Sequence, residues 1–115
     1  MDPAVKALWL TALKSGKYKQ GTRTLKRVNE NGTEHCCLGV LCEIAVAVGV
    51  VSEHYEPAED EASVIYEYGN DMFGYPPKVI RDWADLEECD ATTLAIRNDQ
   101  GHSFEAIAEY ISANY

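Results

Sequence analysis

The segment KSGKYKQGTR, residues 14–23, places cations, an aromatic ring and a side-chain amide close together in the chain. The cations are Lys14, Lys17, Lys19 and Arg23, and the other two groups belong to Tyr18 and Gln20. Ammonium and guanidinium groups bind phosphate through charge-assisted hydrogen bonds, an aromatic ring can stack on a base, and an amide can read the edge of that base. This composition predicts a site for a small anionic, nucleotide-like ligand. The alternative is an ordinary solvated connection in which Tyr18 packs on the core.

A second polar loop, RNDQGHS at residues 97–103, offers further donors and acceptors. Asn98 and Asp99 would complete a pocket if this loop meets residues 14–23 in the fold. They can equally shape the turn and help to start the last helix. The predicted ligand-binding residues are Lys17, Tyr18, Gln20, Arg23, Asn98 and Asp99.

Two adjacent cysteines, Cys36 and Cys37, stand at the head of the stretch CCLGVLCEIAVAVGV. The start of a helix lowers the pKa of a thiol and so favours a thiolate nucleophile. A papain-like cysteine hydrolase with Cys37 (or Cys36) as nucleophile is therefore one interpretation, and His54 or His102 would be its base. The chain has no recognisable glycine-rich loop to stabilise an oxyanion.

The same stretch also has the composition of a core helix, since buried cysteine is among the commonest core residues. We expect Cys36, Cys37 and Cys42 to be structural, with Gly39 allowing close packing. Neighbours on one helix lack the geometry for a disulfide, and their spacing does not suit zinc, which usually takes a Cys-x2–4-Cys turn. We expect no second ligand near Cys89. No metal site or cofactor is predicted, and no phosphate-binding glycine loop occurs.

Charge is distributed unevenly along the chain, whose formal net charge is −9. Residues 1–27 hold seven basic residues against one acidic residue, a net +6, and residues 28–115 hold eighteen acidic against three basic, a net −15. A local basic surface on an acidic body can attract a small anion, whereas most of that body would repel duplex DNA. The plainer explanation is that the two parts attract each other and keep the fold soluble.

The elements that must position these residues follow from hydrophobic periodicity and turn signals. Helical spacing predicts a first helix from Pro3 to about Gly16, and the Asn-Gly pair at 31–32 predicts a hairpin at about 23–36. A central buried helix is expected at about 37–49 and a strand at about 63–68. The remaining segments are predicted as an exposed loop at 52–62, a turn-rich connection at 70–77, short helices from Pro77 and at about 92–97, and a last helix capped by Ser103.

The predicted fold is therefore α+β, a single domain of residues 1–115 with a small antiparallel sheet packed by four to five helices. No apolar run reaches the length of a membrane span, and the N-terminus does not have the pattern of a secretory signal. Reduced thiols and the absence of a paired cysteine framework indicate a cytoplasmic protein.

Four stretches together resemble small proteins encoded by tailed bacteriophages. They are W…AL.SG.Y.QG…L (Trp9 to Leu25), CCLGVLC (Cys36 to Cys42), V…WADL (Val79 and Trp83 to Leu86) and LAIRNDQGHSFEAIAEYI (Leu94 to Ile111). The resemblance implies a phage origin, the cytoplasm of a bacterial host and an accessory role. By analogy of origin, such a protein would counter host defence, either by sequestering a nucleotide-like signal or by blocking a host defence protein. The aromatic content and terminal helices would also suit a homo-oligomer.

Overall fold

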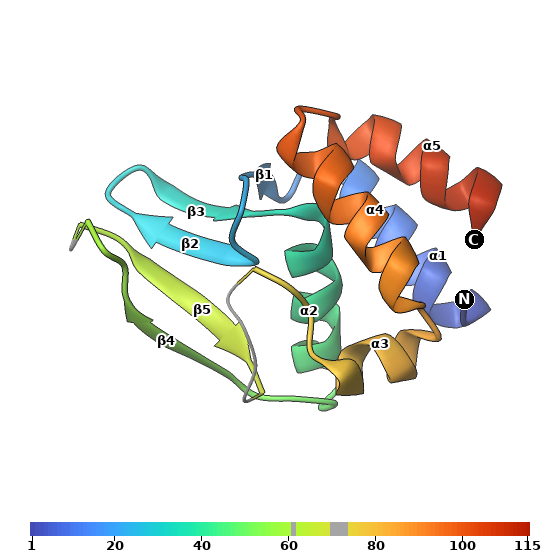
Figure 1. Cartoon of the computed structure of the whole chain (residues 1–115), viewed down its shortest axis with the longest axis horizontal. Coiled ribbons are helices and arrows are strands. Elements are labelled where there is room, and N and C mark those ends of the chain that lie inside the picture. Colours follow the sequence, from blue (N-terminus) through green and yellow to red (C-terminus); the bar gives the residue numbers. More distant parts are fainter. Residues whose placement is uncertain (61, 70–73) are drawn as a thin grey trace.

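The computed structural model describes residues 1–60, 62–69 and 74–115, in which five helices pack beside a five-stranded sheet (Figure 1). The first helix, α1 (Pro3–Lys14), starts where the Asp2 carboxylate accepts a hydrogen bond from the Val5 N–H at 2.9 Å. Pro3 occupies the first helical turn, where no backbone N–H is needed. Gly16 follows the helix with a positive φ of 75°. The predicted first helix is therefore confirmed at both ends.

The central helix α2 (Cys37–Ala47) is the most buried helix of the fold. Its first six residues and Ala45 are buried, as the near-continuous apolar pattern predicted. A Cβ atom at Gly39 would overlap the Leu25 carbonyl oxygen, so only glycine lets the chain before β2 cross this closely. The Trp9 indole of α1 donates a hydrogen bond to the Cys37 carbonyl oxygen at 2.9 Å, which ties α1 to the first turn of α2.

Three further helices complete the helical layer: α3 (Lys78–Ala84), α4 (Glu88–Asp99) and α5 (Phe104–Asn114). The Ser103 hydroxyl accepts a hydrogen bond from the Ala106 N–H at 3.1 Å, which confirms Ser103 as the cap of α5. The helix expected at about 92–97 is longer than predicted. It begins four residues earlier because acidic residues in its first turn favour the positive end of the helix dipole.

The sheet contains β1 (Lys19–Gln20), β2 (Lys26–Asn29), β3 (Gly32–His35), β4 (Glu53–Pro57) and β5 (Val64–Tyr68), in the spatial order β1-β3-β2-β5-β4. The predicted hairpin and the predicted strand at 63–68 are both present, as β2–β3 and β5. The sheet is mixed and not purely antiparallel as predicted, because β1 pairs with β3 in parallel. The two-residue β1 lies in the segment 14–23 that was predicted as a loop.

The prediction of an exposed loop at 52–62 is wrong, because residues 53–57 form β4. This strand lies at the edge of the sheet, where charged residues and a terminal proline are tolerated. The acidic, proline-containing composition therefore reflects an edge strand. In the connection predicted at 70–77, residues 70–73 lie outside the described residues.

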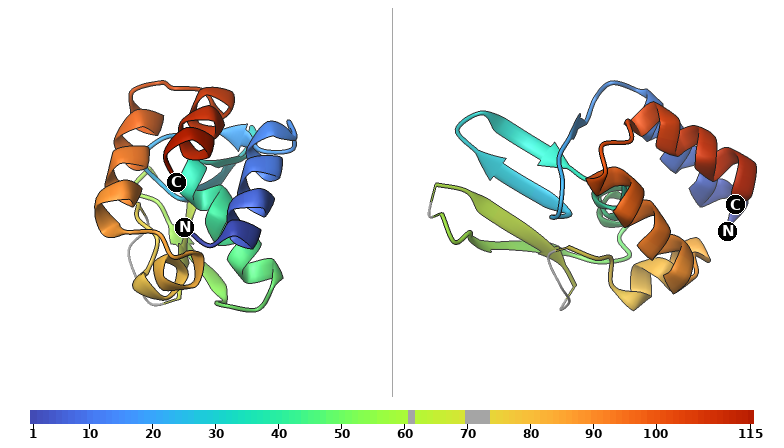
Figure 2. Two further views of the ribbon diagram at one scale, coloured as in Figure 1. Left: turned by 90° about the vertical axis from the view of Figure 1, so that its right-hand side faces the viewer. Right: turned by 45° about the horizontal axis from the view of Figure 1, so that its top comes forward.

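The helices gather at one end of the molecule, and the two hairpins of the sheet extend away from them (Figures 1 and 2). Helix α1 packs against α2 and α5, α2 packs against α4, and α4 packs against α5. Strand β3 runs directly into α2 through His35 and Cys36, so these residues join the sheet to the helices. Within the described residues, no helix combines the length and the apolar character that crossing a bilayer requires.

Candidate functional site

The two predicted polar loops meet in the structure, and Gln20 is the residue that joins them. Its Nε2 atom donates to Asn98 Oδ1 at 2.9 Å and to the His102 carbonyl oxygen at 2.7 Å. Its Oε1 atom accepts a hydrogen bond from the Phe104 N–H at 3.1 Å. Residues 14–23 are thereby fixed to the turn between α4 and α5.

Asn98 lies at the centre of this junction with 0% of its surface exposed. Besides Gln20, its Oδ1 atom accepts a hydrogen bond from the Cys37 N–H at 3.0 Å. Its Nδ2 atom donates to the Gly21 carbonyl oxygen at 2.8 Å. Both amides therefore use their donors and acceptors inside the protein. Gln20 and Asn98 hold the loop in place, and their amides are not free to read the edge of a ligand.

Arg23 has an unusual backbone conformation in this loop. Its φ is +68°, in the left-handed region that costs a non-glycine residue about 1–2 kcal/mol. The Asp99 carboxylate stabilises this conformation by accepting a hydrogen bond from the Arg23 N–H at 2.9 Å. Asp99 thus also acts on the backbone of the loop, and the Arg23 side chain is left exposed.

The cations of the loop lie at the surface. Lys17, Lys19 and Arg23 are exposed, and none of them makes an ion pair with another residue of the described ranges 1–60, 62–69 and 74–115. Tyr18 is half-buried and packs against His35 edge to face, with 5.1 Å between the ring centroids. The Lys17 ammonium lies 5.7 Å from the centre of the Tyr18 ring. Tyr18 therefore packs on the core, as the alternative interpretation of this segment predicted.

The six predicted site residues consequently fall into two groups. Gln20, Asn98 and Asp99 form the internal frame, and Lys17, Tyr18 and Arg23 lie on its outer side. A hollow of about 350 Å³ adjoins the second loop, lined by Thr93, Ile96, Arg97, Gln100 and His102. This hollow was not predicted from the sequence, although Ile96, an isoleucine on the exposed face of α4, was a usable signal.

The cysteines at the start of α2 are buried, and burial raises the pKa of both thiols. Burial raises the pKa of Cys36 to about 11, despite the hydrogen bond that its sulfur accepts from the Gly39 N–H. Burial also raises the pKa of Cys37 well above its ordinary value, and the Cys37 thiol donates to the Leu94 carbonyl oxygen at 3.6 Å. The desolvation of a thiolate here outweighs the favourable helix dipole. This environment suits core packing better than nucleophilic catalysis.

The histidines considered as a catalytic base have other partners. The His54 ring pairs with Glu67 across β4 and β5. His102 lines the hollow beside α4. In the described part of the chain, no hydrogen bond joins either imidazole ring to Cys36 or Cys37.

A cluster of titratable residues, which the sequence analysis did not single out, joins the sheet to α2. The Glu43 carboxylate lies 2.8 Å from the Lys26 ammonium, 3.1 Å from His35 Nε2 and 2.9 Å from the Tyr68 hydroxyl. Burial alone would raise the pKa of Glu43, but the hydrogen bonds from His35, Lys26 and Tyr68 outweigh it and lower the pKa to about 2. The lone acid in an otherwise apolar helix was the signal that could have revealed this cluster.

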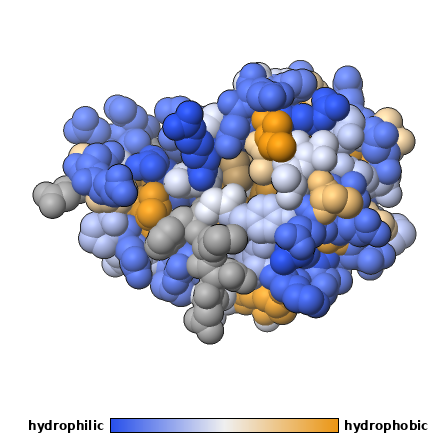
Figure 3. All heavy atoms as spheres, viewed as in Figure 1, coloured by the Kyte–Doolittle hydropathy of each residue, from blue (hydrophilic) through white to orange (hydrophobic). Residues whose placement is uncertain are grey.

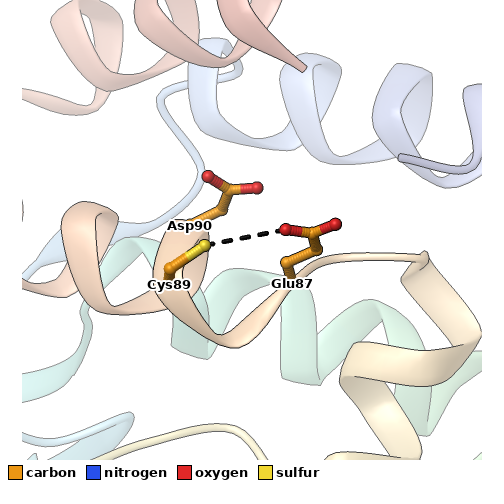
Figure 4. A group of neighbouring side chains, drawn as sticks. All are labelled: Glu87, Cys89 and Asp90. Carbon is orange, nitrogen blue, oxygen red and sulfur yellow. Dashed lines mark hydrogen bonds between the residues drawn. The ribbon is translucent and has the colours of Figure 1, made fainter.

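Acidic and thiol groups also meet at the start of α4 (Figure 4). Glu87, Cys89 and Asp90 each offer one ligand atom, and these atoms lie within 4.8 Å of one another. The Cys89 sulfur lies 3.7 Å from Glu87 Oε2. All three residues belong to one helix start, where carboxylates are favoured by the dipole without any metal. The prediction that Cys89 has no second ligand nearby was wrong, because Glu87 and Asp90, its neighbours in the sequence, place carboxylate oxygens beside its sulfur.

The fold and the loop junction define a small α+β domain in which a mixed sheet abuts a layer of helices around one buried central helix. The chain belongs to the family "Domain of unknown function (DUF8296)", which matches residues 1–115. No curated protein and no solved structure matches the chain.

Proposed function

We propose that this is a binding protein that takes up a small anionic, nucleotide-like ligand on the outer side of residues 17–23. The observation that carries the proposal is the conformation of Arg23. A strained, non-glycine residue stands at a surface position that glycine would occupy at lower cost. A role for the exposed guanidinium explains why arginine stands there.

The frame around this loop supports binding. Hydrogen bonds of Gln20, Asn98 and Asp99 fix the loop backbone before any ligand arrives, so little conformational freedom is lost on binding. Lys17 and Arg23 would then contact the anion through charge-assisted hydrogen bonds, with Tyr18 as the neighbouring ring. The net charge of −9 disfavours a long polyanion, so a ligand with few phosphates fits best.

The role we propose for this binding is an accessory one in a phage-infected bacterium, where sequestering a nucleotide signal would weaken host defence. The resemblance to phage proteins supports this role. Blocking a host defence protein is the other form of the same role.

The test is to identify what the purified protein takes up. The protein would be incubated with a small-molecule extract of bacteria with an active nucleotide-based defence, desalted and denatured, and the released compounds would be identified by mass spectrometry. We expect a released nucleotide from the wild type and none from Lys17→Gln/Arg23→Gln. Lys78→Gln removes an exposed cation on α3 and should release as much as the wild type. Equal release from all three proteins, or no release from any, would contradict the anion site.

A further inference from the structure

A row of side chains crosses one face of the sheet and ends at its free edge. The strand register aligns His35 of β3, Lys26 of β2, Tyr66 of β5 and Tyr55 of β4. The Lys26 ammonium lies 4.2 Å from the centre of the Tyr66 ring, and the centroids of the Tyr66 and Tyr55 rings lie 5.5 Å apart. The row begins in the buried cluster at α2 and ends in solvent, because Tyr55 is 63% exposed.

Tyr55 differs from the other tyrosines in its surroundings. Four tyrosines lie beneath a lysine or arginine, namely Tyr18, Tyr66, Tyr75 and Tyr110. Tyr68 donates to Glu43, and Tyr115 packs against Tyr110. Among the described residues, no cation lies over the Tyr55 ring. Tyr55 is therefore an exposed aromatic ring at the sheet edge that no lysine or arginine of the described residues covers.

The charge around Tyr55 indicates what kind of partner fits. Residues 53–68 contain six acidic residues and no lysine or arginine. Glu53 stands two residues before Tyr55 on the same face of β4 and pairs with Lys26, and the exposed Glu56 follows Tyr55 with its side chain on the opposite face. Carboxylates beside an aromatic face favour a cation and disfavour an anion.

The surroundings of Lys26 in the same molecule show how an aromatic ring and a carboxylate together bind a cation. Its ammonium lies over Tyr66 and at the same time 3.3 Å from a carboxylate oxygen of Glu53. Tyr55, the next ring along the row, belongs to the same acidic edge strand, and its exposed ring could take a cation from outside. On the face of the molecule seen in Figure 3, apolar side chains lie in small, separate spots.

We propose that β4 docks a lysine- or arginine-bearing segment of a partner protein, with one of its cations over the Tyr55 ring. The site lies on the sheet, apart from the loop at 17–23, and its occupant has the opposite charge. The proposal therefore goes beyond the anion site, and either can fail without the other.

The probe is a short, acetylated peptide that alternates arginine and serine, and its matched control has citrulline in place of arginine. Binding would be followed by fluorescence anisotropy at about 20 mM salt, where surface charges are least screened. Tyr55→Phe keeps the aromatic face and should bind as the wild type does, whereas Tyr55→Leu keeps an apolar side chain and should bind about threefold to fivefold more weakly. Binding to Tyr55→Leu equal to that of the wild type would overturn the proposal.

A charge control separates this surface from a general attraction to an acidic protein. Glu56→Gln should weaken the binding of the arginine peptide. Glu105→Gln on α5 removes the same charge elsewhere and should leave the binding unchanged. Equal weakening by both would overturn the proposal. Lys17→Gln/Arg23→Gln, which alters the anion site, should bind the peptide at least as well as the wild type.

A second copy of this chain, with its basic N-terminal segment, is the competing occupant. Sedimentation at about 20 mM salt distinguishes the two. We expect a monomer. Self-association that is lost both in Glu56→Gln and in Lys17→Gln/Arg23→Gln would overturn the proposal of a separate partner.

Discussion

Gln20 Nε2 lies 2.9 Å from Asn98 Oδ1, and this hydrogen bond joins residues 78 positions apart in the chain. It links β1 to the end of α4, and through the Cys37 N–H the same Asn98 oxygen also reaches the start of α2. Three parts of the fold therefore depend on one buried amide, and the exposed cations of residues 17–23 are held by it.

Asn98→Ala should lower the free energy of unfolding by about 3 kcal/mol, because it leaves the Cys37 N–H and the Gly21 carbonyl without their partner and removes one of the two hydrogen bonds that Gln20 Nε2 donates. Asn98→Asp keeps the shape but cannot donate to the Gly21 carbonyl, so it should also destabilise. Urea unfolding measures both. Gln100→Ala, at an exposed position two residues away, should change stability by less than about 0.5 kcal/mol. A stable Asn98→Ala protein would show that the junction is not structural.

The substitution Gly39→Ala tests whether helix propensity or close packing determines the residue at this position of α2. Propensity alone predicts that alanine stabilises α2 by about 1 kcal/mol. The overlap between a Cβ atom and the Leu25 carbonyl predicts strong destabilisation instead, about 3 kcal/mol or more, or failure to fold. Thermal unfolding decides between the two, and a raised melting temperature would refute the close crossing.

Native protein treated with iodoacetamide at neutral pH should be modified at Cys89 alone. Desolvation and the neighbouring Asp90 and Glu87 raise the pKa of Cys89 too, but Cys89 is exposed, whereas Cys36, Cys37 and Cys42 are buried and have raised pKa values. With a pKa of about 11, fewer than about one Cys36 in a thousand is a thiolate at pH 7.5. Peptide mass spectrometry locates the label, and unfolded protein provides the control in which all four cysteines react. Rapid labelling of Cys37 in folded protein would revive the hydrolase interpretation.

The Glu43 cluster predicts a specific acid sensitivity. The folded-state pKa of Glu43, about 2, lies below its ordinary value of 4.5, so its contribution to stability is complete above pH 4.5 and is lost as the pH falls toward 2. Glu43→Gln should destabilise the fold by about 2 kcal/mol at pH 7, because a neutral amide replaces the carboxylate that pairs with Lys26 and accepts from His35 and Tyr68. It should also flatten the stability curve between pH 4.5 and 2. An unchanged slope in denaturant titrations across that range would contradict the role of Glu43.

Local signals explain which parts of the fold were predictable. The apolar run and Gly39 predicted α2, and the Asn-Gly pair predicted the hairpin, whose turn is formed by Glu30 and Asn31. Strand β4 was missed because its pairing partner, β5, and its edge position determine it, and neither can be read from EHYEP. A strand at an edge needs only one neighbour and tolerates charge on its free side.

The candidate site was predictable in composition but not in the roles of its residues. Gln20 and Asn98 were chosen as ligand contacts because amides can read bases, yet the fold uses both amides internally. The left-handed conformation of Arg23 is stabilised by a hydrogen bond to Asp99, 76 positions away in the chain. No local sequence pattern predicts that contact.

The central claim is that Arg23 and Lys17 bind an anion. The most direct measurement is amide chemical-shift mapping by NMR while ATP is added, with adenosine as the uncharged counterpart. The account predicts shifts at residues 17–23 with ATP and not with adenosine, weaker binding as salt is raised, and loss of the shifts in Arg23→Gln. Shifts confined to other parts of the chain, or identical shifts in Arg23→Gln and the wild type, would contradict it.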